Sequence, residues 1–134
     1  MRILTAVFIL LMSTNAFAAV VVVHPSNQSD ISLSEIKKLY LGKKASFDNG
    51  KPAKLATFNE GNDIRIMFNT NVLNKTESMY TGYWAKLTFT GQATPPVSLE
   101  DAEAMKQFVA NNPNAIGIID ESMVDDTLRV VTKF

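Results

Sequence analysis

Short apolar runs alternate along the chain with polar turns, and two kinds of spacing predict strands and helices. Residues 20–23 are a continuous run of valines, which is typical of a strand that is covered on both faces. Other short apolar or β-branched runs predict three more strands. They span residues 53–58, 115–119 and 128–131.

Helical spacing of apolar side chains separates these strands. Ile36, Leu39 and Tyr40 recur at helical intervals within residues 33–41, and Gly42 is a predicted stop signal. Three further helices are predicted: one that starts at Asn62 or Asp63, one over residues 76–86, and one that follows Ser98, with Ser98 and Asp101 as an approximate capping box.

This alternation of strands and helices predicts the fold class. Strands that alternate with helices form α/β layer structures, in which helices flank a central sheet. The chain shows no internal repeat, low-complexity segment or interdomain linker. We therefore predict one α/β domain over residues 19–134.

The N-terminus has the pattern of a secretory signal peptide. A basic start precedes an apolar stretch of about ten residues, which is half of what a membrane-spanning helix needs. Residues 16–18, Ala-Phe-Ala, place small side chains where signal peptidase requires them. We expect a signal peptide over residues 1–18, cleaved after Ala18. The alternative is that this stretch forms a buried first strand or helix.

Composition narrows the class of protein. The chain contains no cysteine, so it lacks the lipid attachment site of a lipoprotein and has no disulfide. We expect a soluble periplasmic protein with no membrane insertion after cleavage.

The charge is nearly balanced. It has 13 Lys and Arg against 13 Asp and Glu, so without Arg2 the mature part carries a net charge of minus one, from 12 against 13. Nucleic-acid binding usually needs a basic excess, so we predict that this protein does not bind nucleic acid. Two groups of like charge are either solvated faces or, for the lysines, an anion-attracting edge. They are Lys37, Lys38, Lys43, Lys44, Lys51 and Lys54, and Asp120, Glu121, Asp125 and Asp126.

Signatures of catalysis are missing. A chain with one histidine and no cysteine cannot build a His or Cys metal cluster. The sequence contains no GxSxG, Walker or GxGxxG motif. His24 is the one candidate for a conventional general base, and an ordinary histidine at a strand end is the simpler interpretation. We predict no enzyme, no catalytic residue, no metal site and no cofactor.

One local pattern indicates anion binding. Residues 58–65 read as a strand end, a glycine-containing loop and a helix start, with Arg65 in the first turn. Free amides at a helix start attract anions, and Arg binds an oxyanion through two parallel hydrogen bonds. The alternative is a capped helix whose Arg65 is solvated or pairs with an acid. Glu60 and Asp63 would also repel phosphate.

Aromatic residues offer a second candidate surface. Tyr83 and Trp84 could mark a binding surface, but they occur at helical spacing with Met79 and Tyr80, which favours a place in the core.

Several of these pieces together resemble the phosphate-binding subunits of ABC importers, of the periplasmic binding protein type 2 superfamily. Residues 34–43, SEIKKLYLGK, are similar to a helix of that family. Residues 53–73 then follow as its ligand strand, loop and helix, and residues 104–119 are similar to its "GAIGY" helix and strand. The resemblance covers residues 33–119 and implies a central mixed sheet flanked by helices.

The chain departs from the family at two points. The family has two lobes that close on the anion, and this chain is long enough for a single lobe. The family's ligand loop reads Arg, three residues, then Ser-Gly-Thr. Those positions here hold Phe58, Asn62, Asp63 and Ile64, while Gly61 remains and Arg65 lies one position later.

Two functions are therefore predicted. The first is a periplasmic solute-binding-type protein for phosphate or a related oxyanion, linked to phosphate ABC import through a permease. Its ligand-binding residues would be Asn59, Gly61, Asn62, Asp63 and Arg65, with Ser26 and Asn27 nearby. The second is a ligand-free periplasmic protein-interaction module in an envelope or appendage assembly. A homodimer would complete the half cleft that one lobe offers.

Overall fold

The computed structural model describes residues 18–134 and shows five strands in one mixed sheet. The strand order is β3-β2-β4-β1-β5, so β3 and β5 are the two edge strands. The α/β fold class with a sheet flanked by helices is thereby confirmed. The strands are β1 (Ala19–Val23), β2 (Lys54–Phe58), β3 (Val97–Leu99), β4 (Ala115–Asp120) and β5 (Arg129–Lys133).

Strand direction decides which side chains share an edge of the sheet. Strand β2 runs parallel to both β3 and β4, whereas β1 runs antiparallel to β4 and to β5. Phe58, Leu99 and Asp120 therefore end their strands at the same border of the sheet. We call this border the carboxyl edge; it runs across the strand ends and is not one of the edge strands. Ligands of open α/β sheets bind outside such an edge.

Each α-helix begins at a polar residue whose side chain accepts a backbone hydrogen bond from the first turn. The helices are α1 (Leu33–Tyr40), α2 (Asp63–Asn71), α3 (Glu77–Phe89) and α4 (Ala102–Asn111), with N-caps Ser32, Asn62, Thr76 and Asp101. A short 3-10 helix, Glu121–Met123, follows β4.

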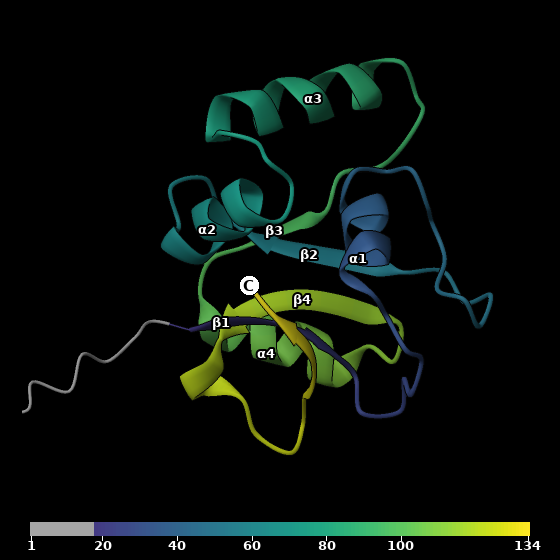
Figure 1. Ribbon diagram of the computed structural model, residues 1–134, viewed down its shortest axis with the longest axis vertical. Coiled ribbons are helices and arrows are strands. Elements are labelled where there is room, and N and C mark those ends of the chain that lie inside the picture. The colour runs from purple at the N-terminus through teal and green to yellow at the C-terminus, as the bar shows by residue number, and fades with distance from the viewer. Residues whose placement is uncertain (1–17) are drawn as a thin grey trace, which may run out of the picture.

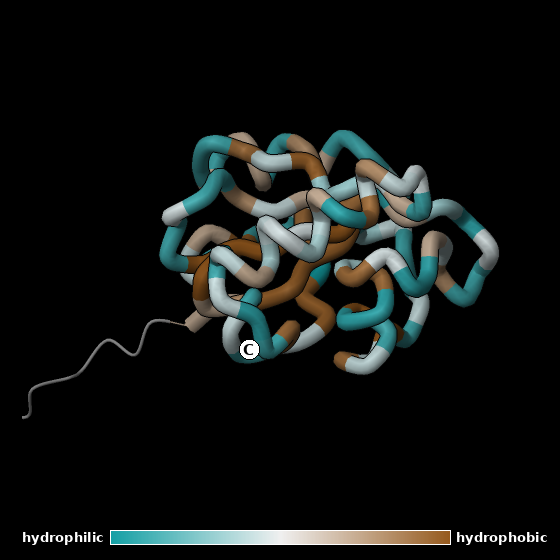
Figure 2. Tube along the Cα trace, turned by 90° about the horizontal axis from the view of Figure 1, so that it is seen from above, coloured by the Kyte–Doolittle hydropathy of each residue, from teal (hydrophilic) through white to brown (hydrophobic). Residues whose placement is uncertain are grey.

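The helices form layers around the sheet (Figure 1). Helix α4 covers one face, while α1 and α2 cover the other. Helix α3 lies beyond the β3 edge of the sheet, outside these two layers. The apolar strands run through the centre of the molecule between polar loops (Figure 2).

The core is built on β1. All five residues of β1 are 0% exposed, as the valine run predicts for a strand covered on both faces. Tyr40 of α1 is also fully buried, and its hydroxyl donates to the carbonyl of Ala56 at 2.7 Å. Burial raises the pKa of the Tyr40 hydroxyl well above its usual value, so it stays a neutral donor.

Glycine permits a close approach at the end of α1. Gly42 has a φ of +69°, and an added Cβ would lie 2.9 Å from Ala93 and 3.0 Å from the Trp84 ring. Gly42 thus ends α1 as predicted. It also leaves room for the indole of α3.

Two predicted elements differ from the structure. Ser98 does not cap a helix, because it lies in β3, paired with Thr57 of β2. Asp101 alone caps α4, accepting from the amide of Ala104 at 2.9 Å. The helix predicted over residues 76–86 continues to Phe89.

Some predictions concern residues outside the described part. The signal peptide of residues 1–18 lies, except for Ala18, outside the residues that the structure describes. Within residues 18–134 no helix has both the length and the apolar character to cross a membrane. The same residues hold no group of three or more metal-ligating side chains.

Candidate functional site

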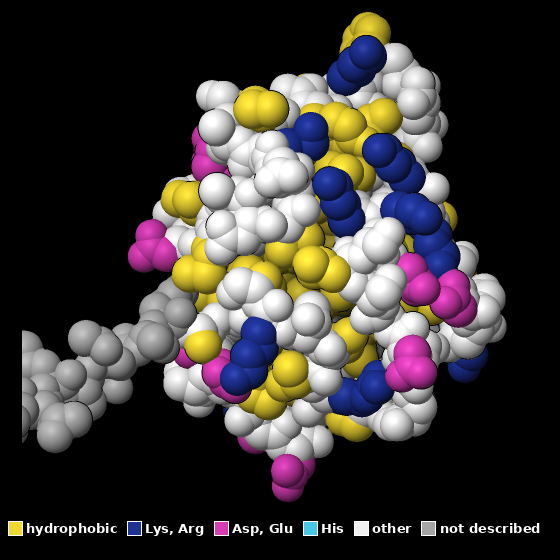
Figure 3. All heavy atoms as spheres, in the orientation of Figure 1, with side chains coloured by type: hydrophobic (Ala, Val, Ile, Leu, Met, Phe, Trp, Pro, Cys, Tyr) yellow, Lys and Arg dark blue, Asp and Glu magenta, His cyan; other side chains and the backbone are white. Residues whose placement is uncertain are grey.

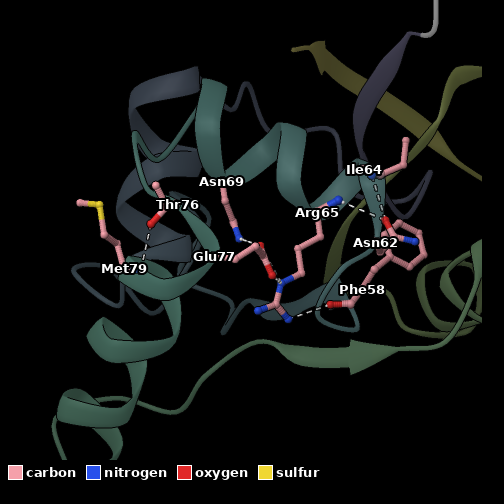
Figure 4. A network of polar contacts seen from close by, with 8 residues as sticks. All are labelled: Phe58, Asn62, Ile64, Arg65, Asn69, Thr76, Glu77 and Met79. Carbon is pink, nitrogen blue, oxygen red and sulfur yellow. Dashed lines mark hydrogen bonds and ion pairs between the residues drawn. The ribbon is translucent and has the colours of Figure 1, made fainter.

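The candidate site is the connection between β2 and α2 at the carboxyl edge (Figure 4). Gly61 turns the chain there with a φ of +86°, a backbone conformation that residues with a Cβ rarely adopt. Asn62 then caps α2, and its Oδ1 accepts from the amides of Ile64 at 2.9 Å and Arg65 at 3.1 Å. These amides would otherwise face an anion, so the cap uses the donors of the predicted site.

Arg65 lies behind this loop and is only 6% exposed. Its Nε donates to Glu77 Oε1 at 3.2 Å and lies 3.1 Å from Oε2, while Nη1 donates to the Phe58 carbonyl at 3.0 Å. Asn69 donates to the same Oε1 at 2.8 Å, which holds the carboxylate in place. Figure 4 shows Glu77 of α3 pointing at the guanidinium. The structure therefore follows the alternative in which Arg65 pairs with an acid.

One nitrogen of the Arg65 guanidinium, Nη2, has no hydrogen-bond acceptor among residues 18–134. The guanidinium also lies 4.7 Å from the centre of the Tyr80 ring, a cation–π contact. Burial raises the pKa of Tyr80 to about 12, so this ring carries no charge against Arg65 near neutral pH.

The charges of the carboxyl edge are mostly negative. Carboxylates lie at or just after the ends of β2, β3 and β4, and one more begins α2. They are Glu60, Glu100, Asp101, Asp120, Glu121 and Asp63. Glu121 is paired with Lys133 at 2.8 Å. Fields of one sign repel ions of that sign, so the edge disfavours a free anion.

The lysines of the first third lie elsewhere. Lys and Arg side chains gather over the region of α1 and α3 (Figure 3). Lys44, which follows α1, pairs with Asp48 at 2.5 Å and Glu35 at 3.6 Å. Lys51 precedes β2 and Lys54 is its first residue, so both lie at the edge opposite to the carboxyl edge.

The structure separates the predicted site residues into two groups. Asn59, Gly61 and Asp63 are exposed beside the cap Asn62 and the buried Arg65. Ser26 and Asn27 were expected near this loop, but the structure places them elsewhere. They follow β1, and the last residue of β1, Val23, pairs with Ile116 near the start of β4, so they lie at the opposite edge of the sheet. Because β1 is antiparallel to β4, the two groups cannot meet on one ligand. Ser26 bonds to His24 and Asn27 caps the turn at Ser29.

An open groove of about 630 Å³ adjoins Arg65 between α3 and β3. Arg65, Tyr80 and Trp84 line it together with Glu60. Tyr80 and Trp84 are 5% and 4% exposed, which confirms the core interpretation for Trp84. The other groove residues are Thr81, Ala85, Thr88, Phe89, Pro95 and Ser98.

Sequence reasoning did not identify Glu77 or the groove. Glu77 is twelve residues from Arg65 and on a different helix, so no local spacing links them. The groove depends on where α3 stands relative to β3, and β3 itself was not predicted.

Comparison with known proteins supports the fold. No protein-family model and no curated protein matches the sequence. A candidate phosphate ABC transporter substrate-binding protein from Clostridium perfringens, solved with bound phosphate, matches with a TM-score of 0.68 and 23% identity, over 87% of this chain and 44% of that one. An ABC-type phosphate transport receptor from Vibrio cholerae matches with a TM-score of 0.59 and 14% identity, over 87% and 46%. PstS from Borrelia burgdorferi matches with a TM-score of 0.66 and 12% identity, over 87% and 47%.

These matches define the class as an α/β domain that corresponds to one lobe of a two-lobed binding protein. Within that class the fold is similar to substrate-binding proteins of phosphate ABC transporters, which are binding proteins rather than enzymes. This chain spans less than half of the length of the solved proteins it matches. The likeness is one of fold.

Proposed function

We propose that this chain is a periplasmic protein-interaction domain built on one lobe of the phosphate-binding fold, exported by the signal peptide predicted over residues 1–18. One observation carries the proposal: the donors of the anion site are used inside the domain. Asn62 takes the amides of Ile64 and Arg65, and Glu77 neutralises Arg65. A phosphate would have to displace a buried carboxylate from a buried guanidinium, and breaking such a pair costs several kcal/mol.

Exposed apolar side chains on α3 support a docking role. Phe89 is 93% exposed and Met79 is 52% exposed, although both belong to the same thirteen-residue helix as the buried Trp84. Apolar residues lie around the whole circumference of α3, a pattern more typical of a helix that is covered on several sides. The partner classes are an ABC permease, another envelope protein or a second copy of this chain.

Photo-crosslinking in cells tests this proposal. A photo-reactive residue in place of Phe89 should give a discrete crosslinked product in the periplasm. The same residue in place of Asp126, which is exposed in the turn before β5, should give none. Calorimetric titration of the purified chain with phosphate and sulfate should give no saturable heat. Saturable phosphate binding without a crosslink at position 89 would overturn the proposal.

Oxyanion binding at the loop of residues 59–65 is a second candidate function. Two observations favour it. Arg65 lines the groove, and no hydrogen bond among the described residues engages its Nη2. A solved neighbour of similar fold contains phosphate. Such binding would be weak because Glu60, Asp63 and Glu77 lie close by.

The substitution Glu77→Gln tests this second candidate. The amide side chain keeps a hydrogen-bond acceptor for Arg65 but removes the competing negative charge. Phosphate should bind this variant at least about tenfold more tightly than it binds the parent chain, a change of about 1.4 kcal/mol. The matched control is Glu103→Gln on the exposed face of α4, which should change nothing. Equal or absent heats in all three proteins would exclude the site.

A further inference from the structure

The groove beside Arg65 has an unpaired strand as one wall and a helix as the other. Strand β3 pairs with β2 on one side and forms the edge of the sheet on the other. Helix α3 stands beyond that edge (Figure 1), and residues of both elements line the groove. The α3 wall carries the small side chains of Thr81 and Ala85 between the large ones of Tyr80, Trp84 and Phe89.

Backbone groups of β3 are available at this edge. The Leu99 carbonyl accepts from the amide of Asn59, so Leu99 directs its backbone groups toward β2. Neighbouring residues of a strand direct theirs to opposite sides. The N–H and carbonyl of Ser98 therefore point away from β2, and Ser98 lines the groove. Within β3 this leaves Ser98 as the residue whose N–H and carbonyl can pair with one more strand.

The surroundings limit what can bind there. Pro95 and Pro96 have no N–H, so strand pairing can extend only from Val97 to Leu99. Helix α3 lies beyond this edge (Figure 1), and its residues line the groove together with Ser98 of β3.

Charge distinguishes the two ends of the groove. Glu60 and Arg65 both line the groove, but Arg65 is already paired with Glu77. Strand β3 runs on to Glu100 and Asp101 at the carboxyl edge, so the unpaired charge there is negative. The exposed Phe89 and Pro95 line the groove as well and are apolar. A partner segment with a basic residue at the carboxyl edge and an apolar side chain beside Phe89 would complement this arrangement.

We propose that the groove between β3 and α3 binds a single extended peptide segment of a partner protein, which adds to the edge of β3. The segment carries apolar side chains and a Lys or Arg that pairs with Glu60. Main-chain hydrogen bonds to Ser98 supply the pairing, and the groove selects alternate side chains. This inference rests on the proposed interaction role and names the surface and the partner chemistry.

The test uses a phage-displayed library of random octapeptides, selected on the full chain. Selected peptides are synthesised with a fluorescent label, and their affinity is measured by anisotropy. Enriched sequences should contain a basic residue together with apolar residues. Their affinity should fall as salt rises, because the Glu60 pair is partly exposed.

Three variants locate the binding. Ser98→Pro removes the outward N–H and should weaken binding at least about tenfold, whereas Ser98→Ala keeps it and should bind within about twofold of the parent. Ala85→Phe fills the groove from α3 without touching β3 and should also abolish binding. Circular dichroism confirms that each variant is folded, and Ala85→Phe keeps the test valid if Ser98→Pro unfolds.

Several results would overturn the inference. They are a library with no enrichment, peptides that bind Ser98→Pro and Ala85→Phe as well as the parent, and a homodimer that Ser98→Pro dissociates. If the crosslink at position 89 persists while no peptide binds the groove, this inference fails and the proposed interaction role stands. If phosphate binds tightly and no crosslink forms at position 89, the proposed interaction role is wrong, and the inference that rests on it is wrong too.

Discussion

Arg65 and Glu77 are the residues that decide what the loop after β2 can bind. The pair is mostly buried, at 7% and 21% side-chain exposure, so water screens it little. The Asn69 amide and the Phe58 carbonyl satisfy further hydrogen bonds of the pair. The carboxylate of Glu77 thus occupies the position in which an external oxyanion would neutralise Arg65.

Removing Glu77 should destabilise the domain strongly. Glu77→Ala leaves Arg65 buried without its counter-charge, and we expect a loss of about 3 kcal/mol, at the lower end for buried pairs because Glu77 is partly exposed. Urea unfolding followed by tryptophan fluorescence measures it, with Glu103→Ala as a surface control near zero. A loss below about 1 kcal/mol would show that water already solvates Arg65.

Tyr40 provides a second test at the residue scale. Its hydroxyl contacts the carbonyls of Ala56 and Ile116, at 2.7 and 3.2 Å, inside the core. Tyr40→Phe keeps the ring and deletes the donor, so the free energy of unfolding should fall by about 1 to 2 kcal/mol. Denaturant titration checks this. An unchanged midpoint would mean that strand pairing alone satisfies both carbonyls.

Strand β3 and the cap of α4 show how one element redefines its neighbour. Ser98 and Asp101 have the sequence of a capping pair, but pairing of Ser98 with Thr57 draws residues 97–99 into the sheet. The helix then begins at Ala102, with Asp101 as its N-cap.

Two alanine variants separate these roles. Asp101→Ala removes the acceptor for the Ala104 amide and should cost about 1 kcal/mol. Ser98→Ala should cost less than about 0.5 kcal/mol, because its backbone pairing is retained. Thermal and urea unfolding of both variants measures the difference. Equal losses would restore Ser98 as part of the cap.

At the scale of the whole molecule, charge and topology oppose free-anion capture together. Parallel strands bring Glu60, Glu100 and Asp120 to one edge, although they are far apart in the chain. The basic residues Lys51 and Lys54 start at the other edge. The two charges nearly cancel in the net charge of the chain, so the net charge alone does not reveal that one edge is acidic and the other basic.

An ion pair between distant parts of the chain gives a pH prediction. Hydrogen bonds from Lys106 of α4 and from Thr127 lower the pKa of Asp125 to about 2, below its unfolded value of about 3.9. Because the folded-state pKa is lowered, the stabilisation is present above about pH 4 and is lost as pH falls toward 2.

The matched variant is Asp125→Asn. It should be less stable than the parent at pH 6, and most of the difference should be lost as pH falls through about 2. Unfolding free energies of both proteins between pH 6 and pH 2 check this. A difference that is constant across that range would exclude the ion pair as its cause.

Much of the fold could be predicted from local pattern. The valine run, the helix start at Asn62 or Asp63, and the stop at Gly42 are local signals, and the structure has an element boundary at each. Strand β3 could not be predicted, because three residues next to two prolines show no periodicity. Ser26 and Asn27 were misplaced because sequence does not give the direction of β1.

By itself the sequence determined every described strand and α-helix except β3, since apolar spacing and capping residues act within a few positions of the chain. It also left both readings of Arg65 open, as an anion ligand or as one half of an ion pair. Only the tertiary structure decided between them, because the partner Glu77 comes from another helix, and helix packing sets that distance. The groove beside β3 was decided at the same level, since it exists only where α3 stands beyond the unpaired edge of the sheet.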